Sequence, residues 1–232
     1  MIYEIEGRIK SIIEKKPEKT CDSWKLDVVF VVDVSMSIEP EHMSSMAKFM
    51  LTMINSMPDT INYACVIFSE KAKDFFKFSN YTPEQVKDKI RRLNEIYHNV
   101  QETRFEIRNQ LGTATNISGG LRVAINDVMT ENSGDRLDVS NVLIVITDGE
   151  ANVGLQDINN QSETLKKLKV KVISVGVGNK TSKTQLLQVT GGQQDLVYDV
   201  HDFKGLCEKL PHISMNAVCN SLSKKIKTLN FY

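Results

Sequence analysis

The chain has 232 residues, a length that suits one medium-sized domain with short extensions. Lys and Arg total 29, as do Asp and Glu, so the formal net charge is +0. This balance argues against a general polyanion binder, and we expect no nucleic-acid partner. No stretch approaches the roughly 20 consecutive apolar residues that a membrane helix requires. We therefore expect no membrane span.

The two ends of the chain differ in composition from its centre. Residues 1–20 are predicted to form an amphipathic helix and a linker, residues 21–219 the main domain, and residues 220–232 a basic tail. The apolar side chains of the first segment recur at helical spacing; they are Ile2, Ile5, Ile9, Ile12 and Ile13. This stripe either packs on the domain or binds another chain, and its pattern fits both.

Four cysteines permit three different pairings. Cys65 lies in the apolar run Tyr63 to Phe68, which favours a reduced thiol packed in a strand. Cys21 and Cys219 flank the main domain, and the ends of a compact domain often lie close together. We therefore favour a Cys21–Cys219 disulfide, with Cys207 as a competing partner; such a bond would indicate an oxidising compartment.

Apolar runs alternate with helical patterns along the main domain, which predicts an α/β fold with a doubly wound, mostly parallel sheet between two helical layers. Strands are expected at 26–33, 62–68, 142–147, 170–177 and 196–199. Helices are expected from Pro40 to Pro58, from Thr82 to Ile96, and at 121–129, 159–168 and 203–210. The polar stretch 97–110 reads as an inserted loop or short helix, and Gly176 to Gly178 as a turn after a strand.

Oxygen-bearing side chains follow the first strand at alternate positions. The apolar run 26–32 leads directly into Asp33, Ser35 and Ser37. Open α/β sheets bind ligands at the carboxyl ends of their strands, and these hard oxygen donors suit Mg²⁺, Ca²⁺ or Mn²⁺ rather than zinc. A serine-rich turn that caps the next helix is the alternative reading of these five residues.

A second buried strand ends in the same way. The run 142–147 is followed by Asp148 and Gly149, so two central strands would each present a carboxylate at one edge. Between them in sequence lies the loop 112–120, which contains hydroxyl groups and glycines that allow the backbone to approach a ligand closely.

With these motifs, the chain resembles the von Willebrand factor type A domain family over about residues 25–215. The resemblance implies a metal-ion-dependent adhesion site built from an Asp-x-Ser-x-Ser motif, a threonine and the aspartate of a Thr-Asp-Gly turn. These positions correspond to Asp33, Ser35, Ser37, Thr115 and Asp148. Thr115 is preferred to Thr113 because Thr115-Asn116 followed by Gly119 matches the family pattern.

The resemblance also implies a binding chemistry. In this family, serine and threonine hydroxyls hold Mg²⁺, with Mn²⁺ or Ca²⁺ as alternatives, while the two aspartates act through waters and by orienting the hydroxyls. An open position on the cation accepts a Glu or Asp carboxylate of a protein partner, such as collagen or another matrix protein. Glu39, Glu150 and Asn152 lie near the ligands in sequence and could shape the rim; the two glutamates could equally be solvated charges at helix starts.

Three classes of function remain to be compared. The favoured one is a secreted, non-catalytic adhesion or matrix module; the alternative is a cytoplasmic scaffold subunit of the same fold. An enzyme is not expected, since His42, His98, His201 and His212 are scattered and none joins a ligand motif.

Overall fold

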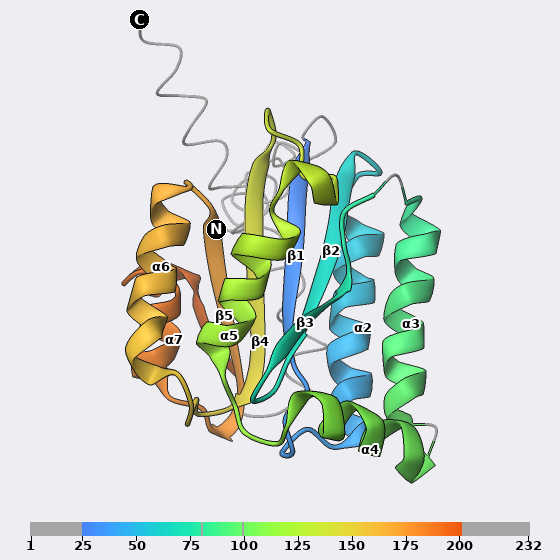
Figure 1. The fold of residues 1–232 in the computed structure, drawn as a ribbon. Helices are drawn as coiled ribbons and strands as arrows, with labels where there is room; N and C mark the ends of the chain where they lie inside the picture. The colour runs from blue at the N-terminus through green and yellow to red at the C-terminus, as the bar shows by residue number, and fades with distance from the viewer. Residues whose placement is uncertain (1–24, 80, 99, 201–232) are drawn as a thin grey trace, which may run out of the picture.

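The computed structural model describes residues 25–79, 81–98 and 100–200. Its centre is a six-stranded sheet with the order β3-β2-β1-β4-β5-β6 (Figure 1). All neighbouring strands are parallel except β2 and β3, which are antiparallel. The strands are β1 (Leu26–Asp33), β2 (Ile61–Phe68), β3 (Ala72–Phe76), β4 (Ser140–Gly149), β5 (Lys171–Lys180) and β6 (Val197–Val200).

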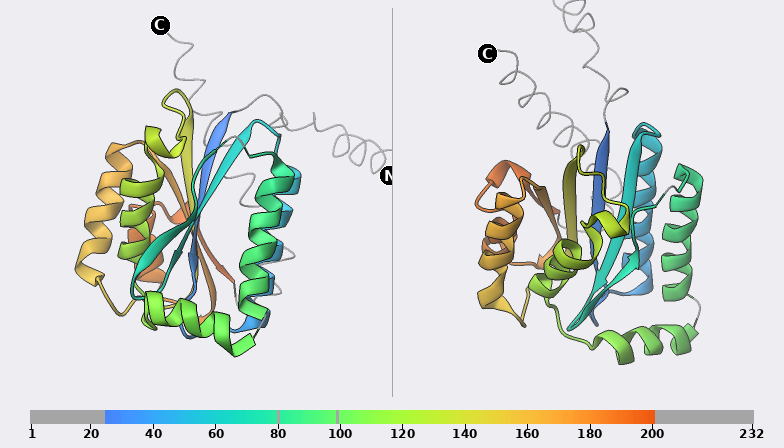
Figure 2. Two further views of the ribbon diagram at one scale, coloured as in Figure 1. Left: turned by 45° about the vertical axis from the view of Figure 1, so that its right-hand side comes forward. Right: turned by 45° about the horizontal axis from the view of Figure 1, so that its top comes forward.

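Helices cover both faces of this sheet, so the domain has three layers (Figure 2). The helices are α2 (Pro40–Ser56), α3 (Pro83–His98), α4 (Val100–Leu111), α5 (Ile117–Val123), α6 (Ile158–Lys167) and α7 (Lys183–Val189). Of these, α4 does not cover a face; it runs across the lower end of the sheet in Figure 1. A π-helical turn at Ala124–Val128 continues α5 directly. The doubly wound α/β fold with a mostly parallel sheet, predicted from the sequence, is therefore confirmed.

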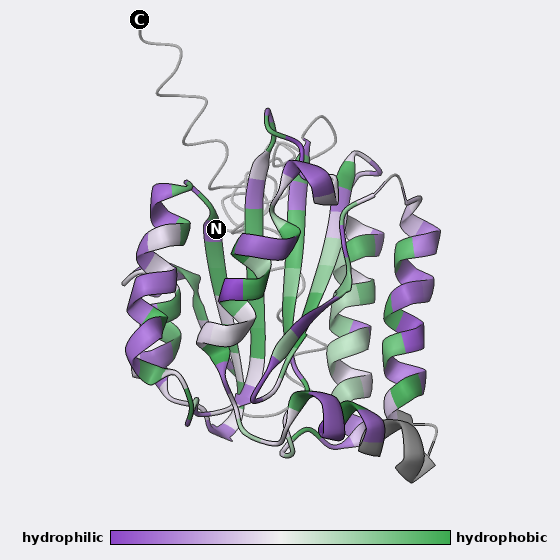
Figure 3. Ribbon diagram, viewed as in Figure 1, coloured by the Kyte–Doolittle hydropathy of each residue, from purple (hydrophilic) through white to green (hydrophobic). Residues whose placement is uncertain are grey.

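The alternation of side chains along β1 explains the two cores. Val28, Phe30 and Val32 pack on one face together with the apolar residues of α2 and α3. Val29 and Val31 point to the opposite face and pack with residues of α5 and α6. Because both faces are buried, the strand is apolar almost throughout, and Figure 3 shows the same hydrophobic colouring across the central strands.

Several predicted elements need correction. The antiparallel edge strand β3 and the short helix α7 were not predicted, and β5 runs through Gly176 to Gly178 where a turn was expected. The helix expected at 121–129 begins at Ile117, because the Asn116 side chain accepts a hydrogen bond from the Gly119 amide and caps it. The stretch 97–110 contains the helix α4.

Other predictions fall partly outside the described residues. Cys65 is a buried free thiol in β2, as expected, and its burial raises its pKa. The N-terminal helix, the helix at 203–210 and the cysteines at 21, 207 and 219 lie outside the described part of the chain. None of the helices within that part combines the length and the apolar character needed to cross a membrane.

Gly120 lets α5 approach the sheet closely. A Cβ atom at this position would lie 2.9 Å from Cγ1 of Val31 and 3.0 Å from Cδ1 of Phe68. We expect Gly120→Ala to lower the free energy of unfolding by about 1–3 kcal/mol, because both neighbours are fully buried and have little room to move. Urea unfolding measures this; a variant as stable as the parent would contradict the close contact.

Candidate metal centre

The parallel pairing of β1 with β4 brings the two predicted aspartates to one edge of the sheet. Val32 pairs with Ile146 in register, so Asp33 and Asp148 both lie where neighbouring strands end. This is the lower edge in Figure 1, beside α4. The juxtaposition follows from topology alone, since parallel neighbours end at the same edge.

Three hydroxyl groups and one carboxylate form a continuous chain at this edge. Thr115 Oγ1 donates a hydrogen bond to Ser35 Oγ at 3.2 Å, and Ser35 Oγ lies 3.2 Å from Ser37 Oγ. Ser37 Oγ in turn donates to Asp148 Oδ1 at 2.6 Å. Each hydroxyl proton can therefore point toward the next oxygen, which leaves lone pairs of all three hydroxyl oxygens free to face a ligand.

Asp33 lies buried behind this row of hydroxyl groups and positions it through hydrogen bonds. Its carboxylate is fully buried; Oδ1 accepts from the Ser35 amide at 2.8 Å and Oδ2 accepts from Thr147 Oγ1 at 2.6 Å. Loss of hydration in this position raises the pKa of Asp33 to about 6, although both hydrogen bonds act to lower it. Because each oxygen already accepts a hydrogen bond, Asp33 is placed to orient the Ser35 loop.

Asp148 has a more polar environment. Burial raises the pKa of its carboxyl, while the hydrogen bond from Ser37 and the charges of His42 and Lys180 oppose the rise. His42 Nδ1 lies 3.7 Å from Asp148 Oδ2. The sequence-based view that no histidine joins the motif residues was therefore wrong for His42.

The structure distinguishes the two candidate threonines. Thr113 is exposed and uses its carbonyl oxygen to accept from the Met36 amide, whereas Thr115 is only 6% exposed and faces Ser35. Asn152 holds the Thr115 backbone through two hydrogen bonds. Its side-chain Oδ1 accepts from the Thr115 backbone amide at 3.0 Å, and its backbone amide donates to the Thr115 carbonyl at 3.0 Å. Asn152 thus positions the loop.

The other predicted rim residues have different surroundings. Glu39 is exposed at the start of α2. Glu150 is exposed too, and its Oε1 accepts from Gln185 Nε2 at 3.3 Å. Large apolar side chains in the segments that follow β1 and β4 face solvent: Met36 is 58% exposed, Val153 37% and Leu155 47%.

Thr147 and His42 were missed by sequence reasoning. Thr147 precedes Asp148 in the Thr-Asp-Gly turn, and an inward-facing hydroxyl at the end of an apolar strand was the signal that could have pointed to it. His42 lies one turn into α2, and no local pattern relates it to a residue more than a hundred positions away.

The donor set fits a hard divalent cation. Hydroxyl and carboxylate oxygens converge within hydrogen-bond distance of one another, and such oxygens are the ligands that Mg²⁺, Mn²⁺ and Ca²⁺ prefer. Among the described residues, no group of three or more His, Cys, Asp or Glu side chains is arranged to hold a metal ion. Any cation at this edge would therefore depend on the neutral hydroxyls.

Comparison with known sequences gives a consistent result. The model of the von Willebrand factor type A domain matches residues 27–212. The collagen alpha-5(VI) chain of Homo sapiens is 32% identical over 193 residues, covering 82% of this chain and 7% of the collagen chain. Matrilin-1 of Homo sapiens is 25% identical over 206 residues, covering 86% of this chain and 38% of matrilin-1. The chain thus spans only part of each relative.

Solved structures support the same fold. Proximal thread matrix protein 1 from the mussel byssus matches with a TM-score of 0.72 at 23% identity, over 84% of this chain and 48% of that one. A second structure of that mussel protein, with a zinc-occupied metal-ion-dependent adhesion site, matches with a TM-score of 0.68 at 25% identity, over 83% of this chain and 45% of that one. The sequence match and the fold together show that the chain belongs to the von Willebrand factor type A domain family.

Proposed function

We propose that this domain is a non-catalytic adhesion module that binds a protein partner through a divalent cation held at Ser35, Ser37 and Thr115. The observation that supports the proposal is the chain of hydroxyl groups that ends on Asp148, with successive oxygens 2.6–3.2 Å apart. Asp33 and Asp148 orient these hydroxyls, with Asp33 acting through the Ser35 amide. The family membership and the collagen and matrilin relatives favour an extracellular protein partner.

The ligand chemistry explains why a partner carboxylate would bind. A bound Mg²⁺ supplies Lewis acidity, which neutral hydroxyl ligands reduce less than direct carboxylate ligands would. Asp33 is withheld from the surface by its hydrogen bonds to Ser35 and Thr147. Asp148 is engaged by Ser37. The residues of the chain thus leave room for an acidic side chain from a partner.

Mg²⁺ is the cation we propose, with Mn²⁺ or Ca²⁺ as substitutes. The oxygen-only donors favour these hard ions. The mussel relative with a zinc-occupied site indicates that a fold of this kind tolerates zinc at the corresponding motif. A competition series with Mg²⁺, Mn²⁺, Ca²⁺ and Zn²⁺ therefore belongs in the first binding experiments.

The rim contributes apolar contact area around the cation. Met36, Val153 and Leu155 are exposed, and they lie in the segments that follow β1 and β4. Backbone hydrogen bonds join Met36 to Thr113 and Val153 to Thr115, which fixes these side chains relative to the hydroxyl groups. We expect the partner to present its carboxylate beside apolar residues, with Glu39, Glu150 and Asn152 at the polar margin.

The test is divalent-dependent retention of matrix proteins. The immobilised domain is exposed to an extracellular matrix extract, and proteins retained in Mg²⁺ are eluted with EDTA. Each purified candidate is then amidated on its carboxylates with carbodiimide and ethanolamine. We expect amidation to abolish retention; a partner retained equally in EDTA, or after amidation, would refute the proposal.

Divalent cations should also stabilise the domain. Cation binding to the folded state alone raises stability in proportion to the logarithm of ligand concentration, by about 2.7 kcal/mol at a concentration one hundred times the dissociation constant. We expect the melting temperature to rise with added Mg²⁺ or Mn²⁺ and to return to its starting value in EDTA. Melting curves that do not respond to either metal would contradict a specific site.

Asn116 begins an Asn-x-Ser sequon beside the proposed site, and we expect it to carry no glycan. Its Oδ1 accepts from Ser118 Oγ and the Gly119 amide, and its Nδ2 donates to the Glu70 carbonyl at 3.0 Å. A glycan on Nδ2 would crowd the contact with the Glu70 carbonyl and cover the binding edge. Glycopeptide mass spectrometry of protein from secreting cells provides the measurement, and occupancy at Asn116 would count against this edge as a partner surface.

A further inference from the structure

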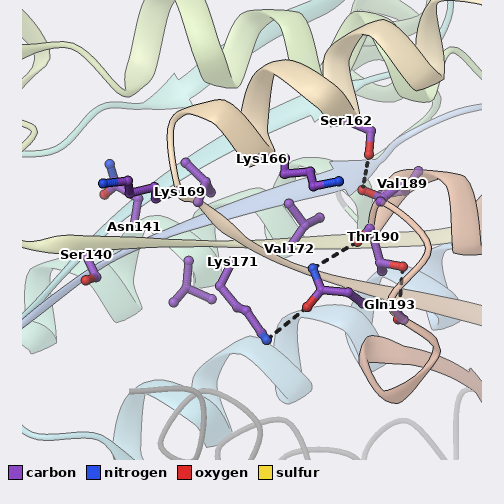
Figure 4. A pocket seen from close by; sticks show the side chains of 13 residues that line it. Ser140, Asn141, Ser162, Lys166, Lys169, Lys171, Val172, Val189, Thr190 and Gln193 are labelled. Atoms are coloured by element: carbon purple, nitrogen blue, oxygen red, sulfur yellow. Dashed lines mark hydrogen bonds between the residues drawn. The ribbon is translucent and has the colours of Figure 1, made fainter. Parts of the chain in front are cut away.

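A hollow lined by both polar and apolar residues lies at the opposite edge of the sheet from the proposed metal centre, where β4 and β5 begin. One cavity of about 270 Å³ is bordered by β4, α6, β5 and the turn after α7, as Figure 4 shows. An adjoining cavity of about 410 Å³ shares Ser140, Asn141, Lys169 and Val170 with the first. The two cavities are neighbours that share part of their lining, and together we call them the basal hollow.

Three lysines border the basal hollow: Lys166, Lys169 and Lys171. Lys166 lies in the last turn of α6, where it offsets the helix dipole, and its Nζ is 3.9 Å from Glu163. Lys171 Nζ donates to the neutral Gln193 Oε1 at 3.2 Å. Within the described part of the chain, neither Lys169 nor Lys171 forms an ion pair, so both charges are available to an anion.

Lys169 occupies a backbone conformation that favours glycine. Its φ is 60°, and it alone among the described non-glycine residues has a positive φ. The turn that ends α6 requires this conformation, because the Val170 amide donates to the Leu165 carbonyl at 2.9 Å. A glycine here would avoid the steric cost of a left-handed lysine.

Hydrogen-bond acceptors lie beside these cations. Asn141 Nδ2 donates to Asp135 Oδ2 at 3.2 Å, which directs Asn141 Oδ1 away from Asp135. Asn141 Oδ1 and Asp135 Oδ1 are both buried, and neither has a hydrogen-bond partner among the described residues. Buried acceptors of this kind are normally satisfied, so a ligand that brings hydroxyl donors would complete them.

We propose that the basal hollow binds a hydroxylated ligand that carries a sulfate or phosphate ester, as an acidic sugar does. Lys169 and Lys171 supply positive charge on two sides of the hollow that attracts the oxyanion, and Asn141 accepts a hydrogen bond from a ligand hydroxyl. The exposed apolar side chains of Leu137 and Leu168 border the adjoining cavity and can contact the C–H faces of a sugar ring. This site is separate from the proposed metal centre and does not depend on it.

The test titrates the full chain, in EDTA, with glucose 6-sulfate, glucose 6-phosphate and glucose by isothermal calorimetry or NMR. We expect both esters to bind and glucose to bind at least tenfold more weakly. The ester that binds with higher affinity shows whether the hollow prefers a sulfate or a phosphate group. Equal affinity for glucose and its esters, or no binding of either ester, would overturn the proposal.

Variants of the lysines test whether their charges contribute to ester binding without a loss of stability. Lys171→Ala and Lys169→Gly are each expected to weaken ester binding about tenfold, the effect of removing one positive charge from the hollow. Lys169→Gly should at the same time raise the melting temperature, because glycine suits the left-handed position. Lys167→Ala removes a neighbouring α6 lysine that does not border either cavity, and it should bind like the parent. Unchanged affinity in both test variants would refute the assignment.

Asn141→Ala tests the hydroxyl contact independently. It should weaken binding of the sugar esters while leaving the weaker binding of inorganic sulfate unchanged, because only the sugars offer a hydroxyl. A variant in Asp33 of the proposed metal centre should bind the esters normally. Loss of ester binding in that variant would assign the ligand to the metal edge and overturn the proposal for the basal hollow.

Discussion

Replacing Asp33 with alanine is expected to weaken Mn²⁺ binding by about 10- to 100-fold and to abolish divalent-dependent partner binding. Asp33 is fully buried and fixes the Ser35 loop through its Oδ1, while its Oδ2 anchors Thr147 of the neighbouring strand. Without it, Ser35 Oγ is no longer held toward Ser37 and Thr115. Calorimetric titration of the full chain with Mn²⁺ measures the effect.

Two further variants separate metal binding from folding. Asp33→Asn keeps an acceptor for the Ser35 amide but lacks the charge, so it should fold like the parent and still bind Mn²⁺ poorly. Asp157→Ala removes an exposed acidic side chain from the turn before α6 and should bind normally. The circular dichroism spectra of all three variants should match the parent. Parental affinity in Asp33→Asn would show that the carboxylate charge is not needed.

Replacing Arg136 with alanine is expected to cost about 3–5 kcal/mol of unfolding free energy, the usual penalty for breaking a buried ion pair. Asp27 is 0% exposed, and its carboxylate accepts from Arg136 Nε at 2.8 Å, from Nη2 at 2.6 Å and from the Arg136 amide at 2.9 Å. Arg136 Nη2 also donates to the Leu26 carbonyl. Removing the guanidinium leaves a buried carboxylate with little to compensate its charge.

Urea unfolding provides the measurement for Arg136→Ala. The matched control is Arg122→Ala, which removes an exposed arginine from α5 and should change stability by less than about 0.5 kcal/mol. Joint replacement of Asp27 and Arg136 by leucine should recover much of the loss, because no buried charge then remains unpaired. A loss below about 1 kcal/mol in Arg136→Ala would show that the pair contributes little to the fold.

The parts of the fold that sequence predicted well share a physical origin. The central parts of strands β1 and β4 are continuous apolar runs because both of their faces are buried, and such runs are easy to recognise. Strand β3 was missed because it lies at the sheet edge and its burial is uneven, so its sequence, Ala72–Phe76, has no clear period. The seven-residue helix α7 is too short for a periodic pattern to stand out.

In the candidate site, too, some residues could be predicted from the sequence and others could not. Asp33, Ser35, Ser37 and Asp148 lie at or just beyond the ends of neighbouring parallel strands, so topology predicts that they meet, and the structure brings them together. His42 joins Asp148 through the tertiary packing of α2 near the sheet edge, which local sequence does not encode. Thr147 has the appearance of an ordinary strand residue until its hydrogen bond to Asp33 is seen.

Anomalous diffraction from crystals of the chain soaked in Mn²⁺ tests the central claim most directly. We predict one strong anomalous peak at the edge of the sheet where β1 and β4 end, in contact with the hydroxyl oxygens of Ser35, Ser37 and Thr115. The peak should vanish in Asp33→Ala crystals grown and soaked in the same way. A parent crystal with no peak among these three hydroxyls, or with manganese bound only elsewhere, would contradict the account.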